Sequence, residues 1–126
     1  MSKTLKLSRK IKGTPEEVYR AFTNPFTIEL WSDSPAVMQE KAGTEFSILD
    51  GAIMGTNVEF VPDKLIRQIW YFGEQGQSEV SIHIQAEKGQ TTVFVEQTNI
   101  PDEAYDNILE GWKESYLGAI KDFFEV

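Results

Sequence analysis

The chain has 126 residues, of which 40% are hydrophobic, 12% aromatic and 25% charged. This length predicts one domain over residues 1–126, and the composition is that of a globular protein with a packed core. The net charge is −8, which repels phosphate backbones and anionic lipid headgroups, so we expect no nucleic-acid partner. No segment has the roughly 18 consecutive apolar residues of a membrane span, and no secretory leader is recognisable. We therefore expect no membrane insertion and a cytoplasmic location.

The residue types that usually build metal sites and nucleophilic sites are scarce. The sequence has no cysteine and a single histidine, His83. This excludes a disulfide framework, thiolate zinc sites, a cysteine nucleophile and every site with two histidines. We expect no metal, no cofactor and no catalytic residue. His83 lies between Ile82 and Ile84, so if these two face the interior, strand alternation places the imidazole on the solvent side.

The first third of the chain predicts a strand followed by two short helices. Polar and apolar residues alternate from Leu5 to Ile11, as in a half-buried strand. Residues 14–17 then read Thr-Pro-Glu-Glu, which supplies a helix N-cap, a proline in the first turn and a glutamate three residues after the cap. Asn24 and Pro25 repeat the signal for a second short helix, which should end near residues 31–35.

The middle of the chain predicts strands joined by short turns. Between residues 36 and 98, turn residues interrupt the apolar runs at 41–43, 49–51, 62–64, 73–77 and 88–90. This spacing gives about six strands, and about seven with the first. Strands joined by such short loops are antiparallel neighbours, so a doubly wound α/β sheet is excluded.

A long helix is predicted from Pro101 to about Phe124. At 100° per residue one arc of about 120° collects nearly all of its large apolar residues: Tyr105, Ile108, Leu109, Trp112, Tyr116, Ala119, Ile120 and Phe123. A helix of about 24 residues is roughly 36 Å long, whereas the expected radius of gyration is about 14 Å. The helix must therefore cross the domain, and the sheet must curve around it.

This order of elements resembles the helix-grip fold of START-like domains. The predicted class is α+β, with a curved antiparallel sheet of about seven strands wrapped around a long C-terminal helix, and two short helices after the first strand. Within the START-like (SRPBCC) superfamily, the sequence resembles the single-domain homologues of the activator of heat-shock protein 90 ATPase. The resemblance rests on residues 9–22, Trp31, Gly43, Phe46, 69–70, 78–84, 91–98, 100–101 and 111–112. It implies an accessory role in stress or chaperone pathways. In eukaryotes the activator also has a separate N-terminal chaperone-binding domain, which has no counterpart in this sequence.

Inward-pointing aromatic and amide side chains form the main candidate site. A sheet that grips a helix without touching its full length leaves a cleft, and large rings with one polar atom suit a flat apolar ligand. The predicted ligand-binding residues are Trp31, Phe46, Gln68, Trp70, Gln97, Trp112 and Tyr116. The alternative is that the rings pack as ordinary core and that the amides hydrogen-bond within the protein.

Three functions stay open on these observations. The first is a non-catalytic START-like domain that binds a small apolar or aromatic molecule, or serves as an accessory factor for a chaperone. The second is a cyclase- or aromatase-like enzyme that uses the same cavity. The third is a protein-interaction module of the heat-shock protein 90 activator type, in which Lys6, Lys10 and Lys12 meet an acidic partner. The same lysines also discourage edge-to-edge strand pairing, which needs no partner.

Overall fold

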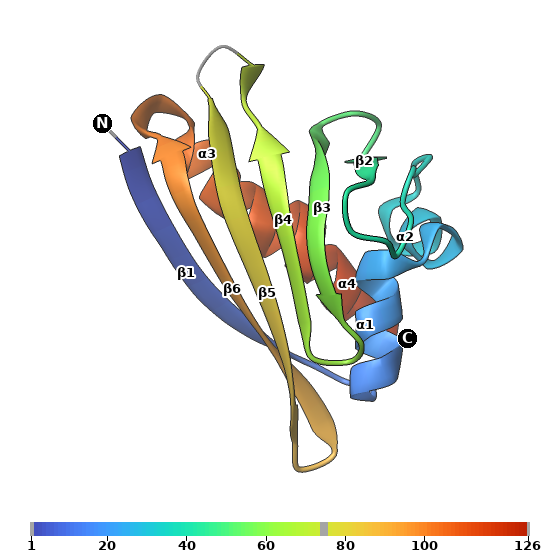
Figure 1. Cartoon of the computed structure of the whole chain (residues 1–126). Coiled ribbons are helices and arrows are strands. Elements are labelled where there is room, and N and C mark those ends of the chain that lie inside the picture. The colour runs from blue at the N-terminus through green and yellow to red at the C-terminus, as the bar shows by residue number, and fades with distance from the viewer. Residues whose placement is uncertain (1, 74–75, 126) are drawn as a thin grey trace.

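The computed structural model describes residues 2–73 and 76–125. Their strands form one antiparallel sheet in the order β1-β6-β5-β4-β3-β2. The strands are β1 (Ser2–Ile11), β2 (Glu45–Ile48), β3 (Ile53–Val61), β4 (Leu65–Tyr71), β5 (Gln77–Glu87) and β6 (Gln90–Pro101). The sheet curves across the C-terminal helix, as predicted for a helix-grip fold (Figure 1). The two short helices, α1 (Pro15–Thr23) and α2 (Pro25–Ser32), lie at the β2–β3 side.

The prediction of about seven strands is wrong by one, because the segment after Pro35 does not form a strand of its own. It makes a single antiparallel bridge, between Val37 and Ser47. The backbone that follows it bonds first into local turns, with the N–H of Lys41 donating to Gln39 and the N–H of Thr44 donating to Lys41, and then reaches β3, where Gly43 and Thr44 bond to Asn57. Groups that are satisfied in local turns are not available for a strand ladder. Residues 74–75 of the predicted turn 73–77 lie outside the described residues, while β4 and β5 on either side of it pair antiparallel.

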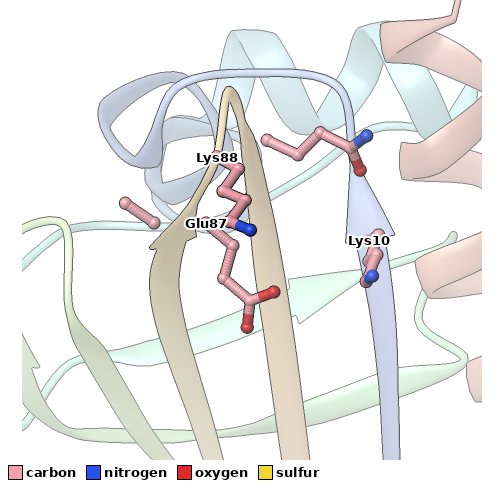
Figure 2. A pocket seen from close by; sticks show the side chains of 5 residues that line it. Lys10, Glu87 and Lys88 are labelled. Atoms are coloured by element: carbon pink, nitrogen blue, oxygen red, sulfur yellow. The ribbon is translucent and has the colours of Figure 1, made fainter.

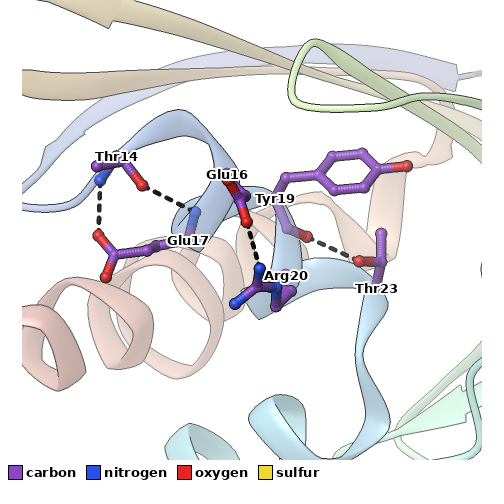
Figure 3. Close-up of polar contacts among 6 residues, drawn as sticks. All are labelled: Thr14, Glu16, Glu17, Tyr19, Arg20 and Thr23. Carbon is purple, nitrogen blue, oxygen red and sulfur yellow. Dashed lines mark hydrogen bonds and ion pairs between the residues drawn. The ribbon is translucent and has the colours of Figure 1, made fainter.

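Helix α1 begins as its sequence predicts. The Thr14 N–H donates to the Glu17 carboxylate at 2.9 Å, and the Glu17 N–H donates to the Thr14 hydroxyl at 3.1 Å (Figure 3). This reciprocal capping box satisfies two donors that the helix itself leaves free. The carboxylate of Glu16 also pairs with Arg20 one turn later. The predicted cap of α2 is confirmed as well, since the Asn24 side chain accepts from the N–H of Thr27 at 3.1 Å.

The C-terminal helix runs over the predicted residues but changes its winding on the way. A 3₁₀ turn, η2 (Asp102–Ala104), leads into α3 (Tyr105–Gly111), then a π-helical turn, η3 (Trp112–Tyr116), and finally α4 (Leu117–Phe124). A π turn holds one extra residue, so every later residue is displaced by one position around the helix. Leu117, which lies outside the predicted apolar arc, is for this reason fully buried beside Tyr116. Uniform steps of 100° per residue cannot reveal such a displacement.

Gly118 belongs to this change of winding. A Cβ atom at this position would lie 2.4 Å from the carbonyl oxygen of Lys113, which is far inside van der Waals contact. The π turn therefore needs a residue without a side chain here. None of the helices in the described part of the chain combines the length and the apolar character of a membrane span.

Candidate functional site: a pocket beside an aromatic stack

The ring of Tyr116 lies at the centre of an aromatic stack. Its centroid is 4.5 Å from Trp112 and 5.2 Å from Trp31, with interplanar angles of 15° and 27°. Trp70 stacks on Trp112 at 5.0 Å and lies almost parallel to Tyr116 at 6.2 Å. Phe22 packs against Tyr116 at 5.6 Å. All five rings are buried, so the π turn of the C-terminal helix, one strand and both short helices meet at one residue.

The three indole N–H groups of this stack all have partners within the protein. Trp31 donates to the carbonyl oxygen of Ala21 at 2.7 Å. Trp70 donates to the side-chain oxygen of Gln68 at 3.0 Å, and Trp112 to that of Gln97 at 2.7 Å. Buried indole donors require such partners, and the two predicted amides therefore position the tryptophan rings.

Behind Trp70 the polar contacts continue through Asn57, a residue that is not among the predicted site residues. The amide nitrogen of Gln68 donates to the side-chain oxygen of Asn57 at 3.0 Å. The amide nitrogen of Asn57 in turn lies 3.2 Å from both the carbonyl oxygen of Gln39 and the hydroxyl of Thr44. Asn57 is fully buried. Its signal in the sequence is an asparagine within an apolar strand, where this residue type is depleted.

Gln97 is held at one end of its amide and free at the other. Its oxygen accepts from Trp112, but its nitrogen is buried and has no hydrogen-bond partner among the described residues. The amide cannot simply be turned around, because the indole N–H needs an acceptor. The orientation of Trp112 thus leaves both N–H donors of the Gln97 amide unsatisfied.

A pocket of about 310 Å³ opens beside the stack, between the C-terminal helix and the β2–β3 hairpin. The rings of Trp70, Trp112 and Tyr116 form one side. The other lining residues are Leu49, Ala52, Ile53, Asn107, Ile108, Gly111 and Ser115. This volume is at the lower end for small-molecule sites, and an apolar lining with a few polar groups is typical of them.

Tyr116 is the ring of the stack that carries a hydroxyl. Burial alone raises its pKa well above the usual range, and no hydrogen bond contributes to the shift. The hydroxyl therefore stays protonated at neutral pH. Among the described lining residues, Tyr116 is the one titratable side chain.

The structure divides the predicted ligand-binding residues into two groups. Trp70, Trp112 and Tyr116 line the pocket, whereas four others lie behind this layer: Trp31, Phe46, Gln68 and Gln97. Phe46 packs beside Gly55, where an added Cβ would lie 3.1 Å from its ring. Sequence reasoning missed the lining residues of the hairpin, which reach the pocket because the sheet curves over the helix.

The three lysines of the basic first strand lie apart from this pocket. Lys6 is 3.5 Å from the carboxylate of Glu96, and both side chains are exposed. Lys10 lines a separate surface pocket of about 460 Å³ together with Glu87 and Lys88 of the β5–β6 hairpin (Figure 2). Lys12 lines a neighbouring hollow of about 710 Å³ at the start of α1. His83 is exposed, and in the described residues no group of three or more potential ligands is placed to hold a metal ion.

Comparison with known proteins assigns the family. Residues 12–125 match the family described as "Activator of Hsp90 ATPase homolog 1-like protein". An activator of 90 kDa heat shock protein ATPase homologue from Dictyostelium discoideum is 31% identical over 98% of this chain, and homologue 1 from Homo sapiens is 27% identical over 88%. This chain spans about a third of the length of these relatives, 33% and 34% respectively.

A solved structure with the same fold is that of an HSP90 activator from Plasmodium falciparum. The two superpose with a TM-score of 0.88 at 23% identity, over 97% of this chain and 96% of the other. The Aha1 dimer from Colwellia psychrerythraea gives a TM-score of 0.86 at 18% identity, over 98% and 96%. These likenesses confirm the helix-grip architecture. The chain belongs to the family of Activator of Hsp90 ATPase homologue 1-like proteins, within the START-like superfamily.

Proposed function

We propose that this chain binds a small, flat, largely apolar molecule in the pocket beside Trp70, Trp112 and Tyr116, and does not transform it chemically. The observation that carries the proposal is the pocket itself, about 310 Å³ in volume and walled by stacked rings. The indoles of Trp70 and Trp112 lie only 12° from parallel. Such a wall offers a planar ligand a surface for stacking, which favours rings over bulky aliphatic groups.

The polar groups of the pocket favour binding over turnover. The two tryptophans donate their N–H groups to Gln68 and Gln97, so neither indole N–H is available to a ligand. The Tyr116 hydroxyl is protonated and has no hydrogen bond that contributes to its pKa. It is therefore suited to donate one hydrogen bond that fixes the orientation of a ligand. An enzyme of the cyclase or aromatase kind would need a further group to move protons.

Native mass spectrometry tests this proposal on protein purified from the cells that make it. We expect a population heavier than the bare chain by one small molecule, released on denaturation and identifiable by its mass. The variant Trp70→Leu, purified in parallel, should lose this population while remaining folded by circular dichroism. Finding the bare chain alone in both preparations, with an apolar dye also failing to bind, would refute the proposal.

A second candidate function is an accessory role toward a 90 kDa heat-shock chaperone. The curated relatives are named as activators of its ATPase, and since this chain spans a third of their length, the role is a proposal for this domain. The predicted contact is the basic strand with Lys6, Lys10 and Lys12. Lys10 and Lys12 both lie near Lys88 of the hairpin, since each shares a surface hollow with it.

The test is the ATPase rate of the purified chaperone with and without this chain. A rate that rises with the wild-type chain, and no longer rises with Lys10→Glu/Lys12→Glu, supports the role. Lys41→Glu, which reverses an exposed charge in the segment before β2, is the control. An ATPase rate that stays unchanged at saturating concentrations of this chain would exclude the accessory role.

A further inference from the structure

The exposed large apolar side chains gather at one end of the molecule. Of the six in the described residues, the four most exposed are Phe26 at 77%, Leu30 at 69%, Val37 at 61% and Met54 at 51%. A fifth, Tyr71, lies beside Met54, and Phe94 alone lies elsewhere. Single exposed apolar residues are ordinary, but a contiguous group marks an interaction site.

Hydrogen bonds and strand register show that this group is contiguous. Phe26 and Leu30 are four residues apart on α2 and so lie on one face of that helix. The carboxylate of Glu29, between them, accepts from the N–H of Ala36 at 3.0 Å. This contact brings the segment with Val37 against α2.

From Val37 the group continues across the outer face of the sheet. Val37 pairs with Ser47, and Ser47 pairs with Met54. In the neighbouring strands β3 and β4, Gly55 pairs with Trp70. Continuing this antiparallel register by one residue places Met54 opposite Tyr71. Directly opposed residues in neighbouring strands share a face, so this row spans three strand spacings, about 14 Å. The buried neighbours of Ser47, which are Phe46 and Ile48, point to the other face.

The segment that supplies most of this row carries almost entirely negative charge. Residues 24–56 contain one lysine, Lys41, and five carboxylates: Glu29, Asp33, Glu40, Glu45 and Asp50. A second copy of the chain would bring its own net charge of −8 against this end, and such like charges repel. A positively charged partner is instead attracted, both in the encounter and in the complex.

We infer that Phe26, Leu30, Val37, Met54 and Tyr71 form a docking face for a basic amphipathic segment of another protein. Apolar side chains of that segment cover the row, and its lysines or arginines meet the surrounding carboxylates. The face lies on the opposite side of the β2–β3 hairpin from the pocket, because Ile53 lines the pocket while Met54 is exposed. It therefore does not depend on the proposed ligand.

The test uses a synthetic peptide of about 14 residues, or four helical turns, with leucines along one face and lysines on the other. Two control peptides separate the apolar from the charged contribution to binding. Serine replaces leucine in one, and glutamate replaces lysine in the other. Binding is measured by fluorescence anisotropy at physiological salt. The binding site on the chain is located from changes in amide chemical shifts. We expect saturable binding of the leucine–lysine peptide, with shifts confined to residues 26–37, 45–56 and 71.

Variants of exposed residues give the decisive comparison. Phe26→Ser/Leu30→Ser should weaken binding at least about fivefold, which corresponds to about 1 kcal/mol. Phe94→Ser, the matched exposed change outside the face, should stay within about twofold of wild type. Equal binding of either control peptide, shifts centred on β1, or an unaffected double variant would overturn the inference. Self-association that the double variant abolishes would also overturn it, because the occupant would then be a second copy.

Discussion

The indole N–H of Trp112 donates to the side-chain oxygen of Gln97 at 2.7 Å, and the nitrogen of the same amide has no partner among the described residues. Gln68 differs, because its amide is bonded at both ends, to Trp70 and to Asn57. Two glutamines that hold two stacked indoles thus differ in how much each contributes to stability.

Replacing each glutamine by methionine measures this difference. Gln68→Met leaves two buried groups unpaired, the Trp70 N–H and the Asn57 oxygen, at a cost of about 1–3 kcal/mol each. Gln97→Met leaves one unpaired, the Trp112 N–H, and removes the unpaired amide nitrogen. We expect urea melts to show a loss of about 2–4 kcal/mol for Gln68→Met and of at most about 1 kcal/mol for Gln97→Met. Equal losses would mean that the Gln97 nitrogen has a partner such as an ordered water.

Trp112→Ala should destabilise the fold strongly. The ring is 1% exposed, stacks on Trp70 and Tyr116, and holds Gln97. Removing it opens a cavity and leaves a buried amide without its donor, so we expect a loss of about 3–5 kcal/mol in urea melts. A loss below about 1 kcal/mol would show that the ring borders open space, with little packing around it.

Two glycines of the C-terminal helix should respond in opposite directions to the same change. A Cβ at Gly111 meets nothing within 4 Å, whereas a Cβ at Gly118 would lie 2.4 Å from the Lys113 carbonyl oxygen. Gly111→Ala should therefore raise the free energy of unfolding by about 0.5–1 kcal/mol through helix propensity. Gly118→Ala should lower it by more than about 1 kcal/mol. Thermal melts of both variants check this, and a stabilised Gly118→Ala would argue against the π turn.

The π turn near these glycines is a feature that could not be predicted from the sequence. The capping box at Thr14 and the extent of the C-terminal helix depend on residues close together in the chain, and both were predictable. The π turn was not, because it depends on contacts between the helix and the rest of the fold. The pocket residues Leu49 and Ile53 could not be predicted either, because their position beside Trp112 follows from the curvature of the whole sheet.

Alkaline pH should destabilise the protein through Tyr116. Burial raises the pKa of this phenol in the folded state, while in the unfolded chain it ionises near its ordinary value of about 10. Its contribution to stability is therefore complete below about pH 10 and is lost as the pH rises further, by at most about 1.4 kcal/mol per pH unit. Urea melts from about pH 8 to 11 should show a shallower decline for Tyr116→Phe than for the wild-type chain.

At pH 7 the same variant should remain within about 0.5 kcal/mol of the wild type, because no hydrogen bond to the hydroxyl contributes to the pKa shift. Tyr19→Phe is the comparison variant, because it removes a hydroxyl that does donate a hydrogen bond, to Glu40 at 2.7 Å. Parallel alkaline declines for the wild-type chain and Tyr116→Phe would show that the phenol is open to water.

Binding of a neutral flat dye tests the central claim most directly. Phenylnaphthylamine is titrated into the wild-type chain, into Gly111→Leu and into Glu110→Leu, with dye emission excited through the tryptophans. Gly111 lines the pocket and has room for a side chain, whereas the neighbouring Glu110 is exposed. We expect saturable binding of one dye per chain to the wild type and to Glu110→Leu, and a loss of at least about tenfold in affinity for Gly111→Leu. Equal binding by all three folded proteins, or no saturable binding by any, would contradict a ligand site in this pocket.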